Sequence, residues 1–398
     1  MKSVEEILKK HPEWPAVSTI FHTLHQKGHL AYLAGGCVRD ALLGILANDL
    51  DIATNATPEQ IEKYFAKVVN VGKSFGVMRV LVDGQDIEVA TFRLDGKYED
   101  GRRPNGVQFS TPEEDAQRRD FTINALFYDL QNQKVLDFVG GLPDLDKKIL
   151  KTVGEAERRF AEDHLRLLRG ARFVAQLGFD LEETTFLAIQ KYADLIKSVS
   201  GERVREEVSK LLGSKFANRG LAIMHQTGLT QALFPIRTPD EFPEGRSQES
   251  WQNLALFFRK LPQENFKKLF QQLRLSVKEQ RAMDDFWKVW HAPEAFFQKR
   301  LGESLQLYQS EGVQWALQNI VLDQPAFAAQ AQDFIKTAEA EGALPEAFLN
   351  GHDLQGKFTG RAMGRCLTEA YYMQLELKWT DKKQALTWLD EQVSKGSF

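Results

Sequence analysis

The chain has few cysteines, no long apolar run and no strong excess of charge of either sign. Its 398 residues include only Cys37 and Cys366, which are too few and too far apart for a disulfide framework or a cysteine zinc site. No run approaches the roughly 18 apolar residues of a membrane-spanning helix, and residues 1–15 lack the apolar core of a secretion signal. The simplest interpretation is a cytoplasmic protein without a membrane partner.

The charge balance limits how the chain can bind a polyanion. Lysine and arginine number 51 against 55 acidic residues, which leaves a formal net charge of −4. There is therefore no global basic signature, and any contact with nucleic acid must use local patches.

The order of the sequence patterns predicts two kinds of structure. Hydrophobic residues make up 43% of the chain and charged residues 27%, as in ordinary globular proteins, and the length suffices for two to four domains. Residues 1–150 mix helical segments with short candidate strands at 31–34, 50–53, 78–82 and 87–92. After residue 155 the period is helical, with predicted helices at 161–177, 182–196 and 203–212, the last starting at Ser200-Gly201-Glu202. We expect a head of strands and helices followed by an all-α body.

The most informative segment is YLAGGCVRDALLGILANDLDIAT, residues 32–54. A short apolar strand meets Gly35 and Gly36, where missing side chains let the backbone approach a phosphate, and a helix carrying Arg39 follows. Asp49 and Asp51 alternate with apolar residues at the strand period of two, which predicts that both carboxylates share one face. Two carboxylates at this spacing can share two Mg²⁺ ions about 3.5–4 Å apart, as in transfer at phosphorus. The combination indicates a nucleotidyltransferase.

A second segment, QRRDFTINA at residues 117–125, brings together two arginines, an acid and an amide. Arginine suits phosphate because its fork donates to two oxygens at once, so this segment can serve a triphosphate and a ribose hydroxyl. The residues concerned are Arg118, Arg119, Asp120 and Asn124. Taken alone, such a cluster is more typical of surface ion pairs.

Together the two segments resemble the motifs G-G-x-V-R-D…D-x-D and R-R-D-F-T-x-N-A of the class II DNA polymerase β-like nucleotidyltransferases. That branch holds tRNA CCA-adding enzymes and bacterial poly(A) polymerases. The resemblance implies an α+β fold, with a polymerase β-like head of mixed sheet and helices followed by an all-α neck, body and tail. It also implies that Asp49 and Asp51 bind two Mg²⁺ ions, while Gly36, Arg39 and Arg119 hold the triphosphate and ribose. Glu88 is either a third carboxylate beside the pair, as in this superfamily, or an edge-strand acid.

The segment from Glu162 to Arg172 resembles the family's E-D-x-x-R motif, in which protein side chains replace a nucleic-acid template. Asp163, Arg166, Arg169 and Arg172 recur every three residues, which predicts a polar ridge on one helix; without the resemblance, an ion-pair ladder would be the simpler interpretation. The resemblance implies that Asp163 accepts from the exocyclic amine of cytosine or adenine and that Arg166 donates to the neighbouring ring nitrogen. Uracil and guanine mismatch both groups, which predicts about 10²–10⁴-fold discrimination. Glu162 would hold Arg166, and Arg169 and Arg172 would extend positive charge toward the triphosphate.

The remaining predictions concern domains and loops. We expect a nucleotidyltransferase head at 1–150, a neck with the nucleotide-selecting motif at 151–214, a body at 215–300 and a tRNA-binding tail at 301–398. Residues 91–114, including Asp100, Arg102, Arg103 and Pro104, correspond to the family's flexible loop, whose presence suggests that the enzyme accommodates A. Eight basic residues between 267 and 300 are either a tRNA backbone surface or a solvated helix face.

The sequence therefore predicts a tRNA nucleotidyltransferase that adds CCA, or its terminal A, to the tRNA 3′ end from CTP and ATP. One alternative is an A-adding enzyme that works with a separate CC-adding enzyme. A bacterial poly(A) polymerase is disfavoured, because its G-R-R-F signature is replaced by Gly72-Lys73-Ser74-Phe75. An alternative of another class is a non-catalytic tRNA-binding protein, which the intact aspartate pair disfavours. The sequence makes no prediction of the oligomeric state.

Overall fold

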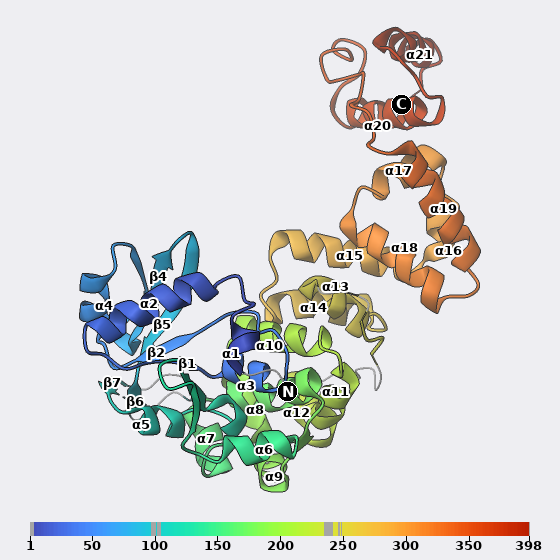
Figure 1. Ribbon diagram of the computed structural model, residues 1–398. Coiled ribbons are helices and arrows are strands. Elements are labelled where there is room, and N and C mark those ends of the chain that lie inside the picture. Colours follow the sequence, from blue (N-terminus) through green and yellow to red (C-terminus); the bar gives the residue numbers. More distant parts are fainter. Residues whose placement is uncertain are drawn as a thin grey trace. The chain divides into compact units, whose positions relative to one another are not determined.

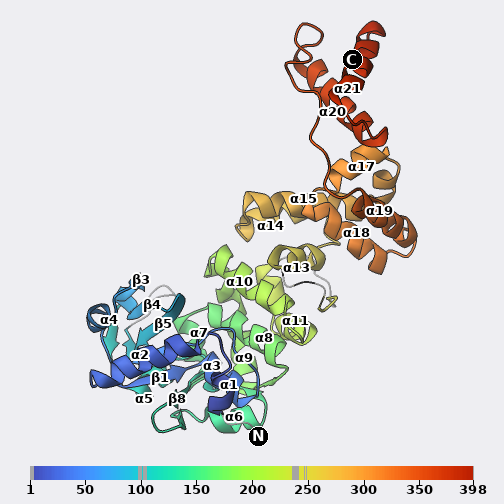
Figure 2. The same ribbon diagram turned by 45° about the horizontal axis from the view of Figure 1, so that its top comes forward.

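The structure, a computed structural model, describes residues 4–96, 101, 105–234, 242–245, 247 and 249–397. Asp100, Arg102, Arg103 and Pro104 of the predicted flexible loop lie outside the described residues. The chain divides into two compact units, Met1–Arg246 and Ser247–Phe398 (Figures 1 and 2). The first unit holds a mixed sheet with helices and the described part of the second is helical, so the predicted fold class is confirmed. The finer division at 150, 214 and 300 stays a prediction.

The main sheet of the first unit has the strand order β3-β4-β5-β2-β1-β8-β9 within the described residues. These strands are β1 (Ala31–Ala34), β2 (Ile52–Thr54), β3 (Val68–Gly72), β4 (Val77–Val82), β5 (Gln85–Thr91), β8 (Leu126–Asp129) and β9 (Lys134–Asp137). β1 runs antiparallel to β2, whereas β2 runs parallel to β5 with Ile52 opposite Val89. This pairing brings the segment before β2 next to Glu88 on β5. Two short pairs complete the strands, β6 (Arg93–Asp95) with β7 (Val107–Phe109) and β10 (Ile149–Leu150) with β11 (Asp180–Leu181).

The strand prediction was right at β1 and wrong at the aspartate pair. β2 begins at Ile52, so Asp49 and Asp51 lie in the segment that leads into the strand and not on a strand that starts at residue 50. The physical reason is that the Leu50 N–H donates to the Glu13 carboxylate. The Asp51 carbonyl already accepts from Ala34 N–H at 3.0 Å, so the ladder to β1 begins one residue before β2.

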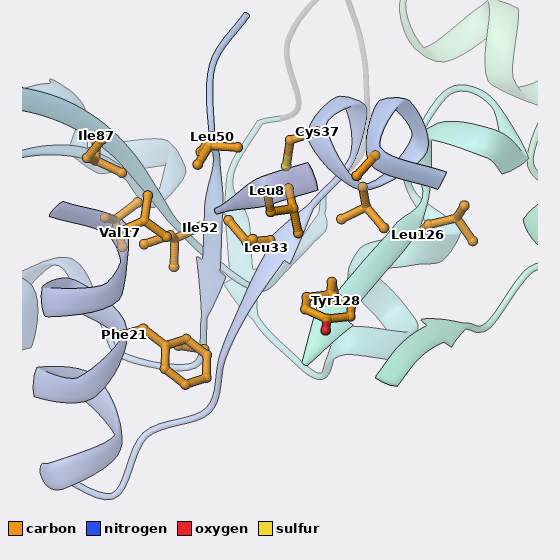
Figure 3. Close-up of a cluster of buried hydrophobic side chains, with 14 of the residues drawn as sticks. Leu8, Val17, Phe21, Leu33, Cys37, Leu50, Ile52, Ile87, Leu126 and Tyr128 are labelled. Atoms are coloured by element: carbon orange, nitrogen blue, oxygen red, sulfur yellow. The ribbon is translucent and has the colours of Figure 1, made fainter. Parts of the chain in front are cut away.

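Strand alternation builds a hydrophobic layer on each face of the sheet. On one face Leu33, Ile52 and Ile87 pack with helices α1 (Val4–Leu8) and α2 (Trp14–Gln26), and Figure 3 shows Leu8, Val17 and Phe21 beside them. On the other face Tyr32 packs with Phe92 and Phe127. The smaller helices of the head are α3 (Gly36–Leu42), α4 (Pro58–Tyr64), α5 (Pro112–Gln117) and α6 (Gly141–Asp146).

Helix α8 (Leu165–Leu177) is the centre of the helical part of the first unit, which also holds α7 (Ala156–Glu162), α9 (Glu183–Tyr192), α10 (Gly201–Leu212), α11 (Ala217–Gln226) and α12 (Leu229–Leu233). Leu165, Leu168 and Phe173 of this helix are buried. Helix α11 approaches closely because Gly220 has no side chain: a Cβ there would lie 2.7 Å from the Ala171 carbonyl oxygen. Helix α10 starts at Gly201 with Ser200 at the N-cap position, as predicted, although the Ser200 side chain makes no capping hydrogen bond.

The predicted single helix at 161–177 was wrong, because α7 ends at Glu162 and α8 begins at Leu165. Asp163 has extended backbone angles, φ −137° and ψ 107°. Its carboxylate accepts from the Leu165 N–H at 3.1 Å, and such a local contact competes with helix continuation. Asp163 is therefore not on the same helix as Arg166, Arg169 and Arg172. The predicted helix at 182–196 also divides, into α9 and a 3-10 turn at Ala193–Ser198.

The described part of the second unit consists of helices. They are α13 (Ser250–Phe257), α14 (Gln263–Gln272), α15 (Val277–His291), α16 (Pro293–Phe297), α17 (Leu301–Leu307), α18 (Glu311–Asp323), α19 (Ala328–Glu341), α20 (Gly360–Glu376) and α21 (Lys382–Ser394). Helices α20 and α21 share a separate small core around Leu354, Cys366 and Leu389. Among the described residues, no helix is long and apolar enough to span a membrane.

Candidate active site

A cleft of about 1170 Å³ opens in the first unit, between the sheet and the start of α8. It brings together the side chains that the two sequence motifs predict, together with the selecting motif from the neck. The predicted site residues that line it are Gly35, Gly36, Arg39, Asp49, Asp51, Glu88, Arg119, Asp120, Asn124, Asp163, Arg166, Arg169 and Arg172. Glu162 lies directly behind this lining, in contact with Arg166.

The acidic side of the cleft carries Asp49, Asp51 and Glu88. Burial, together with the negative charges of Glu88 and Asp49, raises the pKa of Asp51 to about 7. Partial loss of hydration also raises the pKa of Glu88, against the attraction of Arg79. Partly desolvated carboxylates that repel one another are typical of functional sites, and a bound cation would relieve their repulsion.

The donor set fits a divalent cation of the magnesium type. Oxygen ligands from one or two carboxylates, completed by substrate phosphates, are how proteins usually hold Mg²⁺. The part of the chain that the structure describes contains no cluster of three or more His, Cys, Asp or Glu side chains that could hold an ion. Asp49 and Asp51 stay the two ligand candidates that the sequence predicts, and Glu88 lies in the same cleft without completing a three-ligand set.

A tight turn forms the phosphate side of the cleft. Gly35 has a φ of +77° and directly precedes α3, so strand β1 turns into the helix within one residue. A Cβ at Gly35 would lie 2.9 Å from Arg119 Nη1. Arg119 is held by Asp115, with Nη2 to Oδ2 at 3.0 Å, and Nη1 donates to the Asn124 carbonyl at 3.2 Å. The turn and Arg119 thus form a close-fitting, positively charged corner.

Arg39 is buried beneath this corner. Its exposed fraction is 3%, and its guanidinium donates to the carboxylate of Asp40 and to Asn124 Oδ1. The structure therefore places Arg39 as a support for Asn124, and its predicted contact with the triphosphate stays a prediction.

Asp120 ties the head to α8. Its Oδ2 accepts from Arg169 at 2.7 Å, and its Oδ1 accepts from the Phe121 N–H at 2.7 Å and from Asn124 Nδ2 at 3.3 Å. Burial would raise the pKa of Asp120, but the charges of Arg169 and Arg166 outweigh it and lower the pKa to about 2. Asp120 is therefore ionised at neutral pH, and it neutralises part of the charge that Arg169 was predicted to direct at the triphosphate.

The selecting motif is fixed by contacts from three directions. Arg166 Nη1 donates to Glu162 Oε2 at 2.8 Å, the contact that the sequence predicts, and Arg166 Nη2 donates to the Arg118 carbonyl at 2.9 Å. Asp163 Oδ2 lies 2.8 Å from Nη2 of Arg203 on α10. Both groups that were predicted to read the base are thus held before any base is bound.

Sequence reasoning missed several residues that hold the site together: Asp115, Phe173, Arg203 and Glu207. Glu207 lies 2.6 Å from Arg172 Nε, and the Arg172 guanidinium carbon lies 3.6 Å from the Phe173 ring centroid. A signal for two of them was present, because Arg203 and Glu207 are four residues apart and share one face of a predicted helix. Their partners, Asp163 before α8 and Arg172 on α8, follow only from the tertiary packing of α10.

Comparison with known proteins agrees with this geometry. Residues 31–151 match the family described as the Poly A polymerase head domain, and residues 178–240 match the probable RNA and SrmB-binding site of polymerase A. A CCA-adding enzyme of Streptococcus mutans is 32% identical over 397 residues, which cover 94% of this chain and 96% of the relative. The chain belongs to the CCA-adding enzymes.

Two further members of this family show how the likeness is distributed. A CCA-adding enzyme of Bacillus pumilus is 43% identical, but over an alignment that covers 60% of this chain and 58% of that relative. The crystal structure of the Bacillus stearothermophilus CCA-adding enzyme in complex with CTP has a TM-score of 0.71 and 29% identity, and covers 97% of this chain and 98% of that one. The family consists of nucleotidyltransferases, so the predicted enzyme class is confirmed.

Proposed function

We propose that the cleft adds CCA to the 3′ ends of tRNA, taking cytidine and adenosine monophosphate units from CTP and ATP. One observation carries this proposal: the acidic pair, the Gly35–Arg119 corner and the Asp163–Arg166 pair line the same cleft. These are the three groups that a template-independent transfer requires, namely a metal site, a triphosphate site and a base-reading site.

Asp49 and Asp51 would hold Mg²⁺ at the acidic side of this cleft. Two such ions, when bound, supply the chemistry of lowering the pKa of the RNA 3′-OH and stabilising the leaving pyrophosphate. The chain's own residues orient the triphosphate: Arg119, fixed by Asp115, offers donors at the Gly35 turn, where no side chain blocks a phosphate. This arrangement presents the α-phosphate to the attacking hydroxyl with little loss of side-chain freedom.

Asp163 and Arg166 would select the nucleotide by hydrogen bonding. The Asp163 carboxylate accepts from the exocyclic amine that cytosine and adenine share, while a guanidinium donor of Arg166 meets the adjacent ring nitrogen. Uracil and guanine place a carbonyl opposite Asp163 and a ring N–H opposite Arg166. Two unpaired groups of this kind account for about 10²–10⁴-fold rejection.

The test uses three tRNA substrates that end at the discriminator base, at C and at CC, each with labelled CTP or ATP and Mg²⁺. Completion of all three to CCA is the expected result. Extension of the CC form alone would show an A-adding enzyme, and long A tails would show a poly(A) polymerase. No incorporation into any of the three would show a non-catalytic tRNA-binding protein.

The proposal also covers the part of the protein that binds the rest of the tRNA and the location of the protein in the cell. We assign tRNA contacts beyond the 3′ end to the body and tail, and we place the protein in the cytoplasm. The basic residues between 267 and 300 are not simply available to phosphates, because Lys267 and Lys288 pair with Asp284, Lys278 pairs with Glu311 and Arg300 pairs with Glu376. The tRNA surface is therefore expected to extend beyond this segment.

A further inference from the structure

A carboxylate from the N-terminal part of the chain, that of Glu13, makes a hydrogen bond to the backbone at the acidic side of the cleft. The match to the head domain begins at residue 31, so α1 and α2 lie outside it. Glu13, the residue before α2, accepts a hydrogen bond from the backbone N–H of Leu50, with Oε2 2.9 Å from the nitrogen. Leu50 is the single residue between Asp49 and Asp51. The contact therefore holds the peptide that carries both metal-ligand candidates.

Glu13 is itself held in place. His11 is 7% exposed, and its Nδ1 accepts from the Glu13 backbone N–H at 3.2 Å. The Glu13 side chain is 21% exposed, so the hydrogen bond to Leu50 is largely shielded from water.

Leu50 is the residue at which the loop after α3 becomes anchored to the core. Before it, Ile45 and Leu46 are 51% and 49% exposed, and Ala47 is only partly buried against the core. Leu50 is 1% exposed, and its side chain lies in the cluster with Leu8 and Val17 (Figure 3). Packing holds the Leu50 side chain, and Glu13 holds its backbone. Together they set the direction in which the two flanking side chains leave the chain.

We propose that Glu13 is a positioning residue that orients Asp49 and Asp51 toward the cation through the Leu50 peptide. Glu13 acts from behind the loop and contacts neither nucleotide nor metal. This inference rests on the proposed function, because the proposed function assigns Asp49 and Asp51 their role as metal ligands. It assigns to the N-terminal helices a part in transfer that the matched head region does not contain.

The test compares Glu13→Ala, Glu13→Gln and a matched control, Glu5→Ala, whose carboxylate pairs with Lys9 on the same helical segment. Two readouts do not depend on turnover: amide hydrogen exchange at Leu50, and Mn²⁺ binding to the full chain followed by electron paramagnetic resonance. Glu13→Ala is expected to speed exchange at Leu50 and to weaken Mn²⁺ binding about tenfold, the usual effect of losing a group that orients a ligand. Glu13→Gln keeps an acceptor oxygen and is expected to behave like the parent, as is Glu5→Ala.

Catalysis gives a third readout. In CTP incorporation, Glu13→Ala is expected to raise the Mg²⁺ concentration for half-maximal rate while the KM for CTP at saturating Mg²⁺ changes little. Parent-like Mn²⁺ affinity in Glu13→Ala, or equal defects in Glu13→Ala and Glu13→Gln, would overturn the proposal. A parent protein that incorporates no nucleotide would instead overturn the proposed function, and the exchange and Mn²⁺ measurements would still decide the role of Glu13. If Glu13→Ala fails to fold, the exchange rate of Leu50 in Glu13→Gln decides, because the proposal requires it to stay at the parent value.

Discussion

Replacing Asp51 with asparagine is expected to abolish nucleotide transfer and to stabilise the metal-free protein. The pKa of Asp51 is about 7 in the folded state against an ordinary value of 3.8, because burial and the charges of Glu88 and Asp49 disfavour its ionised form. Each pKa unit corresponds to about 1.4 kcal/mol, so ionisation of this one side chain costs the folded state at most about 4 kcal/mol. Asparagine has nearly the same shape and carries no charge, so it removes this cost together with the metal ligand.

The sign of the pH dependence follows from the raised pKa. Below about pH 3 the Asp51 carboxyl is protonated in both states, and the parent loses nothing. As pH rises toward 7 the unfolded state ionises first, so the parent loses stability and reaches its full loss above pH 7. The advantage of Asp51→Asn should therefore be near zero at pH 3 and largest at pH 8, because the other titrating groups contribute equally to parent and variant.

The assay is amide hydrogen exchange of β1 in the presence of a chelator, because it reports opening of the first unit alone. Addition of Mg²⁺ should stabilise the parent and leave Asp51→Asn unchanged, since only the parent keeps both ligands. A parent that is as stable as the variant at pH 8 without metal would refute the electrostatic reasoning. Retained transfer by Asp51→Asn would show that the metal site lies elsewhere.

Three further predictions concern the other walls of the cleft. Asp163→Ala should lower discrimination against UTP about 10–100-fold in competition assays, because one of two base-reading groups is lost; rejection of UTP at the parent level would contradict the protein-template account. Gly35→Ala should raise the KM for CTP about tenfold or more, since the new Cβ would lie 2.9 Å from Arg119 Nη1, whereas Gly84→Ala, with similar φ and open space, should not. Asp120→Asn should lower the free energy of unfolding by about 2 kcal/mol at pH 7, because it removes the charge of the closer of the two carboxylates that pair with Arg169. Because the pKa of Asp120 is lowered to about 2, that difference should shrink as pH falls from 4 to 2 in urea denaturation, and a pH-independent difference would contradict it.

Local patterns predicted the parts of the fold in which neighbouring residues decide the structure. The strand at Ala31–Ala34, the glycine turn and the start of α10 at Ser200 all follow from residues within one turn of each other. The order of head and helical parts follows from a change of hydrophobic period. Sequence motifs also named the residues that meet in the cleft, because each motif supplies one wall of it.

The errors arose where a side chain makes a contact that its neighbours in sequence do not reveal. Asp163 interrupts a helix that the spacing of the arginines favours, since its carboxylate caps Leu165 and pairs with Arg203 on another helix. Asp49 lies before β2 and not on a strand, since the Leu50 N–H bonds to Glu13, 37 positions earlier. Tertiary partners of this kind override a periodic pattern, and one sequence gives no means of pairing them.

The break in the helix explains how base selection and phosphate binding are linked. If Asp163 and Arg166 lay on one helix, the helical rise would set the distance between them. Because the helix is broken, Arg203 fixes Asp163 and Glu162 fixes Arg166 independently. Arg166 Nη2 also donates to the carbonyl of Arg118, and the next residue, Arg119, forms the triphosphate corner at Gly35. In the proposed function, one peptide unit would therefore connect the group that reads the base to the group that holds the phosphates. We expect a base that leaves Arg166 unpaired to disturb the segment that carries Arg119, so that a mismatch costs alignment of the triphosphate as well as a hydrogen bond.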